Sequence, residues 1–440
     1  MFKRMWNRWG DIEKKRYTAS IRDMEISFRG AHITKEQGDA AHALLLPYRT
    51  DIASIPPCTY EKKESALLLP LDASILEKTK KVVDELVTTP LETLVLVGIG
   101  GSSRGAEAVL KLIKAPQCTV LDELNTEKTQ ETIARISSLS ESSKFLIIVV
   151  SKSGKTIEPL AHIETLYGAL HQQFPDIASR ILAISTDDSP LLQNAKEKNI
   201  RTLSFPEAVS GRFSVFSPVG LAPLYALGVD VSSFIEGGKE PLQTLQHADK
   251  VDPAVLHASF LTSAYQQGRH IHELYLLHKK FTALGAWYQQ LLAESTGKES
   301  VGITPILSTP SDFHATLGLS LEGPPDKTTC FLSSVEEGNP LLHLQDTRLF
   351  EEASRGISGN IGDIHCLLWE SVQETYEKRQ TPRMSITLKN RSLREIGAFM
   401  SYAMLSTAYT AHLLGVDAFT QHAIDEYKQT ARNKMQKNTI

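Results

Sequence analysis

The chain has 440 residues, a length that predicts two or three domains at about 150 residues per domain. Hydrophobic residues make up 41% and charged residues 22%, which is the composition of a folded globular protein and excludes wholesale disorder. The 47 Lys and Arg nearly balance the 51 Asp and Glu, for a formal charge of −4. The charge balance therefore gives no support to nucleic-acid binding.

The cysteines and the first residues predict a cytoplasmic protein. The four cysteines are widely scattered, without a CxxC pair or zinc-ligand spacing, so we expect reduced thiols and no metal. The basic start, residues 1–16, lacks the apolar run of a signal peptide. No stretch reaches about 18 uninterrupted apolar residues, so the sequence predicts no contact with a membrane.

Short apolar runs that alternate with helical patterns are the main structural signal. Six of these runs are strand candidates: 93–97, 145–150, 181–185, 274–277, 304–307 and 328–332. Continuous apolar strands that alternate with helices predict mainly parallel sheets covered on both faces. The last stretch, 393–435, is expected to form two helices with a hinge near Gly415. The sequence therefore predicts an α/β fold.

The strand candidates fall into two groups, which predicts two α/β units. We place the first unit at 90–230 and the second, which includes the C-terminal helices, at 255–430. The segment 1–90 is irregular in pattern with some helical stretches, and we expect it to pack against the α/β core.

Two loops at predicted strand ends have residues suited to a phosphate, since ligands of doubly wound sheets bind at the carboxyl ends of strands. GIGGSSRG, at 98–105, lacks the third glycine of a dinucleotide fingerprint, and a tight turn is an equally good interpretation. SKSGKT, at 151–156, combines three hydroxyls with the free amides of a helix start, which suits a phosphomonoester, although a plain helix cap is the alternative. Val149 stands where a nucleotide P-loop has glycine, which argues against a nucleotide triphosphate.

Further side chains suited to catalysis lie outside these loops: Arg212, Gln290, Glu294, His314, Gln421 and Lys428. Gln290 and Glu294 are four residues apart, on one face of a predicted helix that breaks at Gly297. Gln421 and Lys428 are seven residues apart, which places them on one face of the last predicted helix. Taken singly, each has an ordinary alternative, such as a surface ion pair for Arg212 or a solvated loop side chain for His314.

Five segments, in their order along the chain, resemble the glucose-6-phosphate isomerase (phosphoglucose isomerase) family. They are GIGGS at 98–102, SKSGKTIEP at 151–159, SGRFSVFSPVG at 210–220, QQLLAESTGK at 289–298 and LGVDAFTQHAIDEYK at 414–428. The resemblance runs from about Thr93 to Met435. The chain departs from the family pattern at Lys155, where bacterial members usually have Thr, at Ser210, which replaces Gly, and in the residues on either side of His314.

This resemblance implies two sugar-isomerase domains, each a three-layer αβα sandwich, and the isomerisation of glucose 6-phosphate to fructose 6-phosphate in glycolysis and gluconeogenesis. That reaction moves a proton between C2 and C1 through a cis-enediol(ate), and the resemblance assigns the base to Glu294. Arg212 is permanently charged and suits the stabilisation of the enediolate. His314 and Lys428 are the residues implied in opening the sugar ring.

The resemblance also implies how substrate and partner bind. The residues expected at the sugar phosphate are Ser151, Lys152, Ser153 and Thr156 at the phosphate, with Gly101, Ser102, Gln290 and Gln421 along the sugar. No metal or organic cofactor is implied. Members of the family are typically homodimers, in which the histidine that corresponds to His314 crosses from the neighbouring subunit.

Two alternative functions stay open. A non-catalytic regulator that binds sugar phosphates would be expected to lose Glu294 or Arg212, whereas both are present. A dual-specific isomerase for glucose and mannose phosphates would carry the same motifs. A related amino-sugar isomerase is disfavoured, because such enzymes usually carry a glutaminase domain and no cysteine follows Met1.

Overall fold

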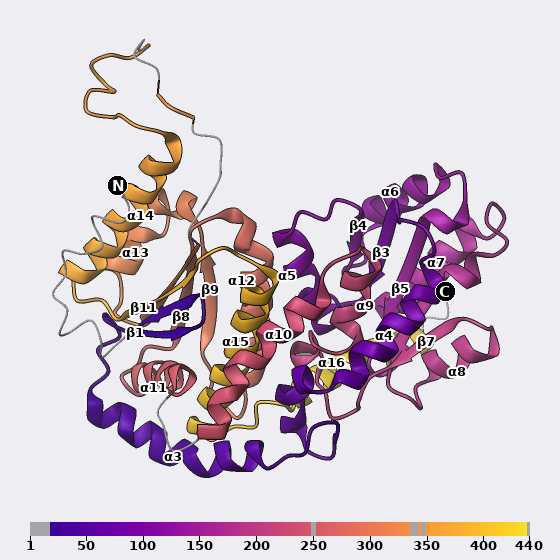
Figure 1. The fold of residues 1–440 in the computed structure, drawn as a ribbon, viewed down its shortest axis with the longest axis horizontal. Coiled ribbons are helices and arrows are strands. Elements are labelled where there is room, and N and C mark those ends of the chain that lie inside the picture. The colour runs from indigo at the N-terminus through magenta and orange to yellow at the C-terminus, as the bar shows by residue number, and fades with distance from the viewer. Residues whose placement is uncertain (1–17, 248–251, 335–341, 345–348, 438–440) are drawn as a thin grey trace.

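Two mainly parallel sheets, each covered by helices, form the computed structural model, which describes residues 18–247, 252–334, 342–344 and 349–437 (Figure 1). The predicted α/β class with mainly parallel sheets is therefore confirmed. The basic stretch 1–16 lies outside the described residues. None of the helices in the described ranges combines the length and the apolar composition needed to cross a bilayer.

The first sheet contains five parallel strands in the order β4-β3-β5-β6-β7. Their bounds are β3 (Thr93–Val97), β4 (Cys118–Leu121), β5 (Phe145–Val150), β6 (Ile181–Ser185) and β7 (Arg201–Ser204). The three central strands have the predicted bounds, and every residue in them is buried, which explains their continuous apolar sequences. The edge strands β4 and β7 are partly exposed and mixed in composition, so the sequence did not indicate them.

Helices cover both faces of this first sheet. They are α4 (Ala73–Leu86), α5 (Arg104–Leu112) and α9 (Pro218–Ala226) on one face, and α6 (Thr126–Ser137), α7 (Ile157–Leu170) and α8 (Pro190–Glu197) on the other. Alternate residues of each central strand pack against the two layers: Leu94 and Leu96 face one cluster, and Val95 and Val97 face the other. The first sheet is thus the middle layer of an αβα sandwich.

The second sheet contains six strands in the order β1-β2-β11-β10-β8-β9. Their bounds are β1 (Thr18–Ile21), β2 (Met24–Ser27), β8 (Ile271–Leu276), β9 (Thr304–Ser308), β10 (Lys327–Ser334) and β11 (Arg383–Leu388). Strands β8 to β11 are parallel, whereas β1 and β2 form an antiparallel hairpin that pairs with β11. The N-terminal segment, which we expected only to pack against the core, therefore adds two strands to this sheet.

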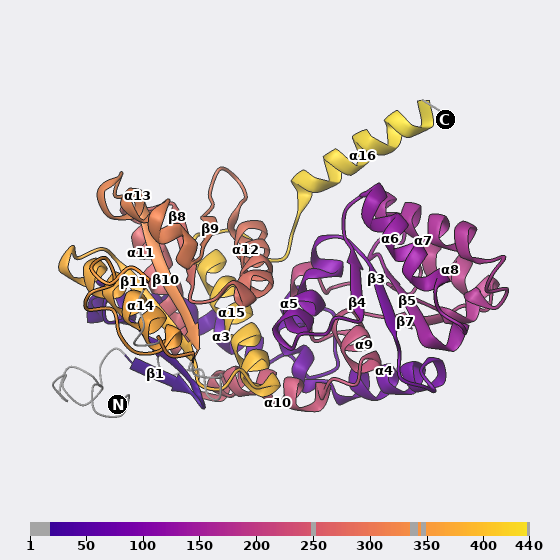
Figure 2. The ribbon, with the colours of Figure 1, turned by 90° about the horizontal axis from the view of Figure 1, so that it is seen from above.

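The helices of this half either follow the hairpin or accompany the second sheet. They are α3 (Lys35–Ala53), α10 (Val231–Leu242), α11 (Pro253–Gln266), α12 (Thr282–Thr296), α13 (Leu317–Glu322), α14 (Ile361–Lys378) and α15 (Leu393–Leu413). Figure 2 shows α5, α10, α12 and α15 between the two sheets, where α12 packs against α5 and α10 packs against α15. The C-terminal half of α12 thereby reaches the loops of the first sheet.

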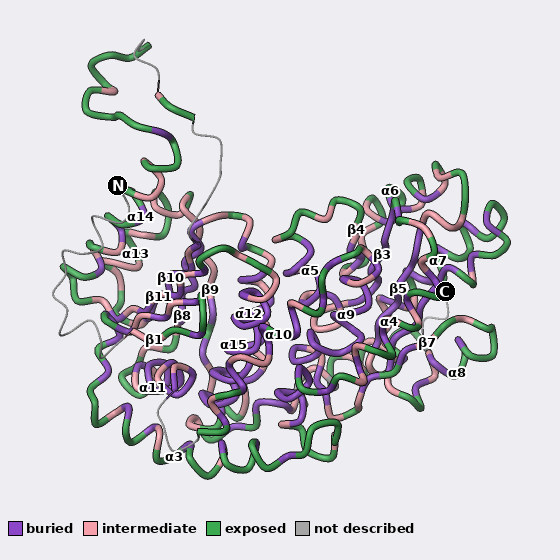
Figure 3. Tube along the Cα trace, in the orientation of Figure 1, coloured by how far each residue is buried: buried purple, intermediate pink, exposed green. Residues whose placement is uncertain are grey.

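Two segments extend away from the body of the molecule. Residues 349–359, which precede α14, project from the half that contains the second sheet and are mostly exposed (Figure 3). The C-terminal pair of helices predicted at 393–435 is observed as α15 and α16 (His422–Lys437), and α16 projects from the body of the molecule beside the first sheet (Figure 2).

Candidate active site

Two glycine-containing turns meet in direct backbone contact between the sheets. The turn η3 (Gly100–Ser102) follows β3, and η6 (Gly211–Phe213) follows β7. A Cβ atom on Gly101 would lie 2.2 Å from the carbonyl carbon of Gly211 and 2.5 Å from the amide nitrogen of Arg212. Only glycine allows this approach, because any side chain would displace backbone atoms. The contact fixes Arg212 beside the loop at the end of β3.

Arg212 is the buried centre of the site, and each of its three side-chain nitrogens donates a hydrogen bond. Nε donates to Ser295 Oγ at 2.9 Å and Nη1 to Glu294 Oε2 at 3.2 Å. Nη2 donates to the carbonyl oxygens of Ala418 and Thr420. Because the Arg212 side chain is 0% exposed, the alternative of a surface ion pair is wrong. Burial lowers the pKa of Arg212, and the Glu294 carboxylate opposes that shift.

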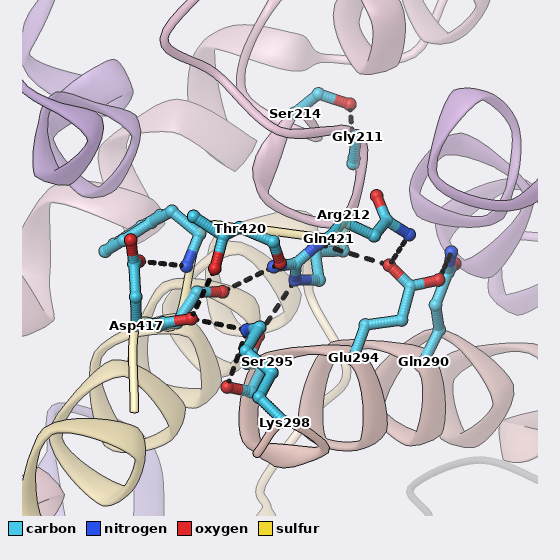
Figure 4. Close-up of polar contacts among 12 residues, drawn as sticks. Gly211, Arg212, Ser214, Gln290, Glu294, Ser295, Lys298, Asp417, Thr420 and Gln421 are labelled. Atoms are coloured by element: carbon cyan, nitrogen blue, oxygen red, sulfur yellow. Dashed lines mark hydrogen bonds and ion pairs between the residues drawn. The ribbon is translucent and has the colours of Figure 1, made fainter. Parts of the chain in front are cut away.

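Glu294 lies next to Arg212 and accepts hydrogen bonds at both carboxylate oxygens (Figure 4). Gln290 Nε2 donates to Oε1 at 2.8 Å, and Gln421 Nε2 donates to Oε2 at 2.8 Å, the oxygen that also accepts from Arg212. Gln290 and Glu294 both project from α12, one helical turn apart as predicted. These three hydrogen bonds hold the carboxylate of Glu294 in one orientation. The Glu294 side chain is also 21% exposed, so the carboxylate still reaches solvent.

Lys298 and Asp417 complete the polar network, although sequence analysis did not select them. Lys298 Nζ donates to the carbonyl oxygens of Ser295, at 3.0 Å, and of Asp417. Asp417 also forms an ion pair with Lys63 at 2.6 Å. Burial, together with the nearby Arg212, lowers the pKa of Lys298 to about 8. Both residues lie inside matched motifs, but their contact joins positions 119 residues apart, which no local pattern indicates.

The SKSGKT loop connects β5 to α7, as the sequence predicted. Ser151 is buried, and its hydroxyl donates to Thr156 Oγ1 at 2.9 Å. Thr156 is the N-cap residue of α7, but its side chain makes no capping hydrogen bond, so the alternative of a plain helix cap does not hold for it. Gly154 turns the backbone at φ +62°, and Ser153 is exposed. The amides at the start of α7 and the Ser153 hydroxyl therefore remain available to an anion.

Lys152 supplies a positive charge within this loop and is half-buried. Burial lowers the pKa of Lys152, Glu207 opposes the shift, and the positive charge of Arg212 adds to the lowering. The C-terminal helix also reaches this loop, since Arg432 Nη2 of α16 donates to the carbonyl oxygen of Lys155 at 2.9 Å.

Gly101, Ser102, Gln290 and Gln421, the residues predicted along the sugar, lie on segments that meet at Arg212 and Glu294. Gly100 precedes Gly101 and Ser102 in η3 and has φ +58°. A Cβ atom on Gly100 would lie 3.0 Å from Gln290 Nε2. A cleft of about 970 Å³ opens beside this group, and Gly100, Arg104, Gln290 and Glu294 are among the residues that line it. A molecule that enters this cleft can therefore reach the carboxylate of Glu294.

His314 and Lys428 are not brought into this group. His314 is exposed and lies at the end of η9 (Pro310–His314), after β9, and Lys428 is in α16. Among the described residues, neither side chain forms a hydrogen bond with Glu294 or Arg212. The prediction that Gln421 and Lys428 share a helix face is wrong, because the backbone at 417–421 forms a turn over Arg212 and α16 begins only at His422.

Comparisons with known proteins identify the family of this chain. The family model described as phosphoglucose isomerase matches residues 83–311. Among curated proteins, the glucose-6-phosphate isomerase of Methanocaldococcus jannaschii is 30% identical over 343 residues, which are 77% of this chain and 83% of that protein. The glucose-6-phosphate isomerase of Rubrobacter xylanophilus is 28% identical over 385 residues, which are 83% of this chain and 88% of that protein.

Solved structures share the fold over most of the chain. A glucose-6-phosphate isomerase from Chlamydia trachomatis superposes with a TM-score of 0.77 at 16% identity, over 98% of this chain and 92% of that one. A hypothetical protein from Thermus thermophilus gives a TM-score of 0.80 at 24% identity, over 94% of this chain and 99% of that one. Together with the family match and the curated relatives, these findings establish that the chain belongs to the phosphoglucose isomerase family.

Proposed function

We propose that this protein interconverts glucose 6-phosphate and fructose 6-phosphate, a step of glycolysis and gluconeogenesis. The observation that carries the proposal is the Glu294 carboxylate, which Arg212, Gln290 and Gln421 hold in one orientation at a cleft between the sheets. A positioned base beside a permanent cation is the pair that proton transfer through an enediolate needs. The curated relatives named glucose-6-phosphate isomerase support the same assignment.

Glu294 acts as the base that moves the proton. It removes the proton from C2 of the open-chain aldose, the electron pair forms the C1–C2 double bond, and negative charge develops on O1. The hydroxyl proton of O2 passes to O1, and the same carboxyl group returns its proton to C1 while O2 becomes the carbonyl oxygen. Arg212 Nη1 carries two N–H groups, and Glu294 accepts from this nitrogen once, so a second donor remains for the enediolate.

The phosphate of the substrate binds at the SKSGKT loop. Ser153, Thr156 and the amides at the start of α7 supply donors, and Lys152 supplies a positive charge. Ser151 contributes mainly by ordering the loop, because it is buried and its hydroxyl donates to Thr156. Lys155, which stands in place of the usual Thr, is exposed at the outer side of this loop, where its carbonyl accepts from Arg432.

Ring opening is assigned to His314 and Lys428, and we propose a homodimer in which His314 serves the site of the neighbouring subunit. His314 is exposed and makes no contact with Glu294 in its own chain, as expected of a side chain that completes a second site. Exposed apolar residues in α14 and in the segment before it are a further reason, because large apolar side chains left in solvent favour association. These residues are Leu349, Phe350, Ile361, Leu367 and Leu368.

We also propose a cytoplasmic location and two sugar-isomerase domains at 90–230 and 255–430. The free thiols of Cys58, Cys118 and Cys330 support a reducing compartment. Separate sheets in the two ranges support the division, with the hairpin β1–β2 completing the second domain.

The test is an assay of fructose 6-phosphate formation from glucose 6-phosphate without added metal, with mannose 6-phosphate alongside. We expect turnover of glucose 6-phosphate by the wild type and none by Glu294→Gln. Binding of glucose 6-phosphate without turnover would contradict the proposal and favour the regulator. Comparable turnover of mannose 6-phosphate would establish the dual-specific enzyme instead.

A further inference from the structure

A buried carboxylate in the second sheet is hydrogen-bonded to both ends of the segment that carries His314. Glu273 lies within β8 and is 0% exposed. Ser308 Oγ donates to its Oε1 at 2.6 Å, and Ser320 Oγ donates to its Oε2 at 3.0 Å. Ser308 is the last residue of β9 and Ser320 lies in α13, so His314 is six residues from each.

Glu273 is stabilised in the interior by hydroxyl groups alone among the described residues. Thr329 Oγ1 donates to Oε2 at 3.4 Å and Tyr376 Oη donates at 3.3 Å, in addition to the two serines. No Lys, Arg or His of the described chain forms an ion pair with it within 4.0 Å. A buried carboxylate is costly unless hydrogen-bonded, so the four donors are held firmly around it.

The chain between the two serines is short and internally braced. Thr309 N donates to Asp312 Oδ2 at 2.7 Å, which closes the turn η9. Phe313 packs against the ring of Tyr275 on β8, with 5.5 Å between ring centroids. The exposed imidazole of His314 therefore takes its position from a turn that is anchored to the sheet on both sides.

We propose that Glu273 is a positioning residue for His314. The inference rests on the proposed role of His314 in ring opening. Without the two serine hydrogen bonds, η9 keeps its own closing contacts and the packing of Phe313 on Tyr275, but it loses both polar attachments to Glu273, so the turn and its imidazole shift relative to the sheet. Proton transfer by Glu294 is spared, because among the described residues neither Glu294 nor Arg212 forms a hydrogen bond with Glu273 or with the four hydroxyls around it.

The test compares two variants that each remove donors to Glu273. Ser308→Ala/Ser320→Ala removes the donors on the His314 segment, whereas Thr329→Val removes a donor on β10 and serves as the matched control. Each is assayed with glucose 6-phosphate, which is mainly cyclic, and with erythrose 4-phosphate, whose phosphorylated O4 prevents ring closure. We expect the double variant to lose at least about tenfold in kcat/KM on glucose 6-phosphate and less than about twofold on erythrose 4-phosphate. Thr329→Val should change neither by more than about twofold.

Two further variants separate this inference from the proposed function. His314→Ala should show the same selectivity, and adding Ser308→Ala/Ser320→Ala to it should cause no further loss on glucose 6-phosphate, since both act through one group. If His314→Ala is slowed equally on both substrates, its role in ring opening fails. If His314→Ala is selective but the serine variant is not, or the serine variant causes the same loss without His314, the positioning role of Glu273 is overturned. The unfolding midpoint of every variant is measured as well, to check that the variant is folded.

Discussion

Replacing Gly101 with alanine should disable the site by forcing two backbone segments apart. The added methyl carbon would lie 2.2 Å from the carbonyl carbon of Gly211 and 2.5 Å from the amide nitrogen of Arg212. Real Cβ atoms essentially never approach other atoms within 3.0 Å, so the turns η3 and η6 must separate by about 0.8 Å, the difference between 3.0 and 2.2 Å. The obstacle is backbone, which cannot rotate away as the end of a side chain can.

Gly101→Ala should lower both the unfolding free energy and the turnover. Overpacking of this kind costs about 1–3 kcal/mol of unfolding free energy. A displacement of Arg212 by nearly an ångström relative to the turn at Gly101 should lower turnover by about 100-fold, because reacting groups must be placed to within a fraction of that distance. Turnover of glucose 6-phosphate and urea unfolding of the purified variant measure the two effects separately.

Two other glycines provide matched controls. A Cβ atom on Gly211, at the same contact, would lie 3.3 Å from the Cα atom of Gly101, so Gly211→Ala needs a shift of only a few tenths of an ångström and should lose less than about tenfold in turnover. Gly168 is exposed in α7 with nothing within 4 Å of its Cβ position, and Gly168→Ala should leave turnover unchanged and add up to about 1 kcal/mol of stability. Wild-type turnover and stability in Gly101→Ala, or equal losses in all three variants, would refute the reasoning.

Further measurements test the rest of the site. Glu294→Gln should lower turnover by at least about 100- to 10,000-fold while sugar-phosphate binding persists, and near-normal turnover would contradict its role as base. A crystal soaked with 5-phosphoarabinonate should show the phosphate at 151–156, and an anion bound only elsewhere would count against that loop. His314→Ala should be far slower on cyclic glucose 6-phosphate than on erythrose 4-phosphate, and equal losses would exclude ring opening. Burial lowers the pKa of Lys298 to about 8 from about 10.4 in the unfolded chain, so the unfolded state binds more protons between these values. The unfolding free energy relative to Lys298→Met should therefore rise as the pH is increased from 8 to 10, and a difference independent of pH would contradict that pKa.

The strands that could be found from the sequence are those whose surroundings are uniform. β3, β5 and β6 are buried on both faces, so every position is apolar and the bounds are clear. β8 was placed too late, at 274 instead of Ile271, because the polar residues His272 and Glu273 interrupt the apolar run near its start. These polar residues are buried with 0% exposure and bind Thr328 and Ser308 on neighbouring strands, partners that a local pattern does not show.

The strands that the sequence did not predict are not buried on both faces, or they depend on pairing with a distant segment. β4 and β7 are partly exposed edges of the first sheet, and β1 and β2 form a hairpin whose place in the second sheet depends on pairing with β11, more than 350 residues away. β11 alternates buried and half-buried residues, so its composition resembles that of an ordinary amphipathic segment. Strand pairing over such distances is a property of the assembled sheet and not of either sequence.

For the site, local sequence patterns were enough to predict which segments come together and how side chains are spaced within one helix. Gln290 and Glu294 point the same way because the geometry of a helix is local and repeats every 3.6 residues. No local pattern predicts that Arg212 is buried, that its nitrogens donate to Glu294 and to the carbonyl oxygens of residues 418 and 420, or that Lys298 donates to Asp417. These contacts span 82 to 208 residues of sequence, and they exist only because α12 and the turn at 417–421 pack against the loops of the first sheet.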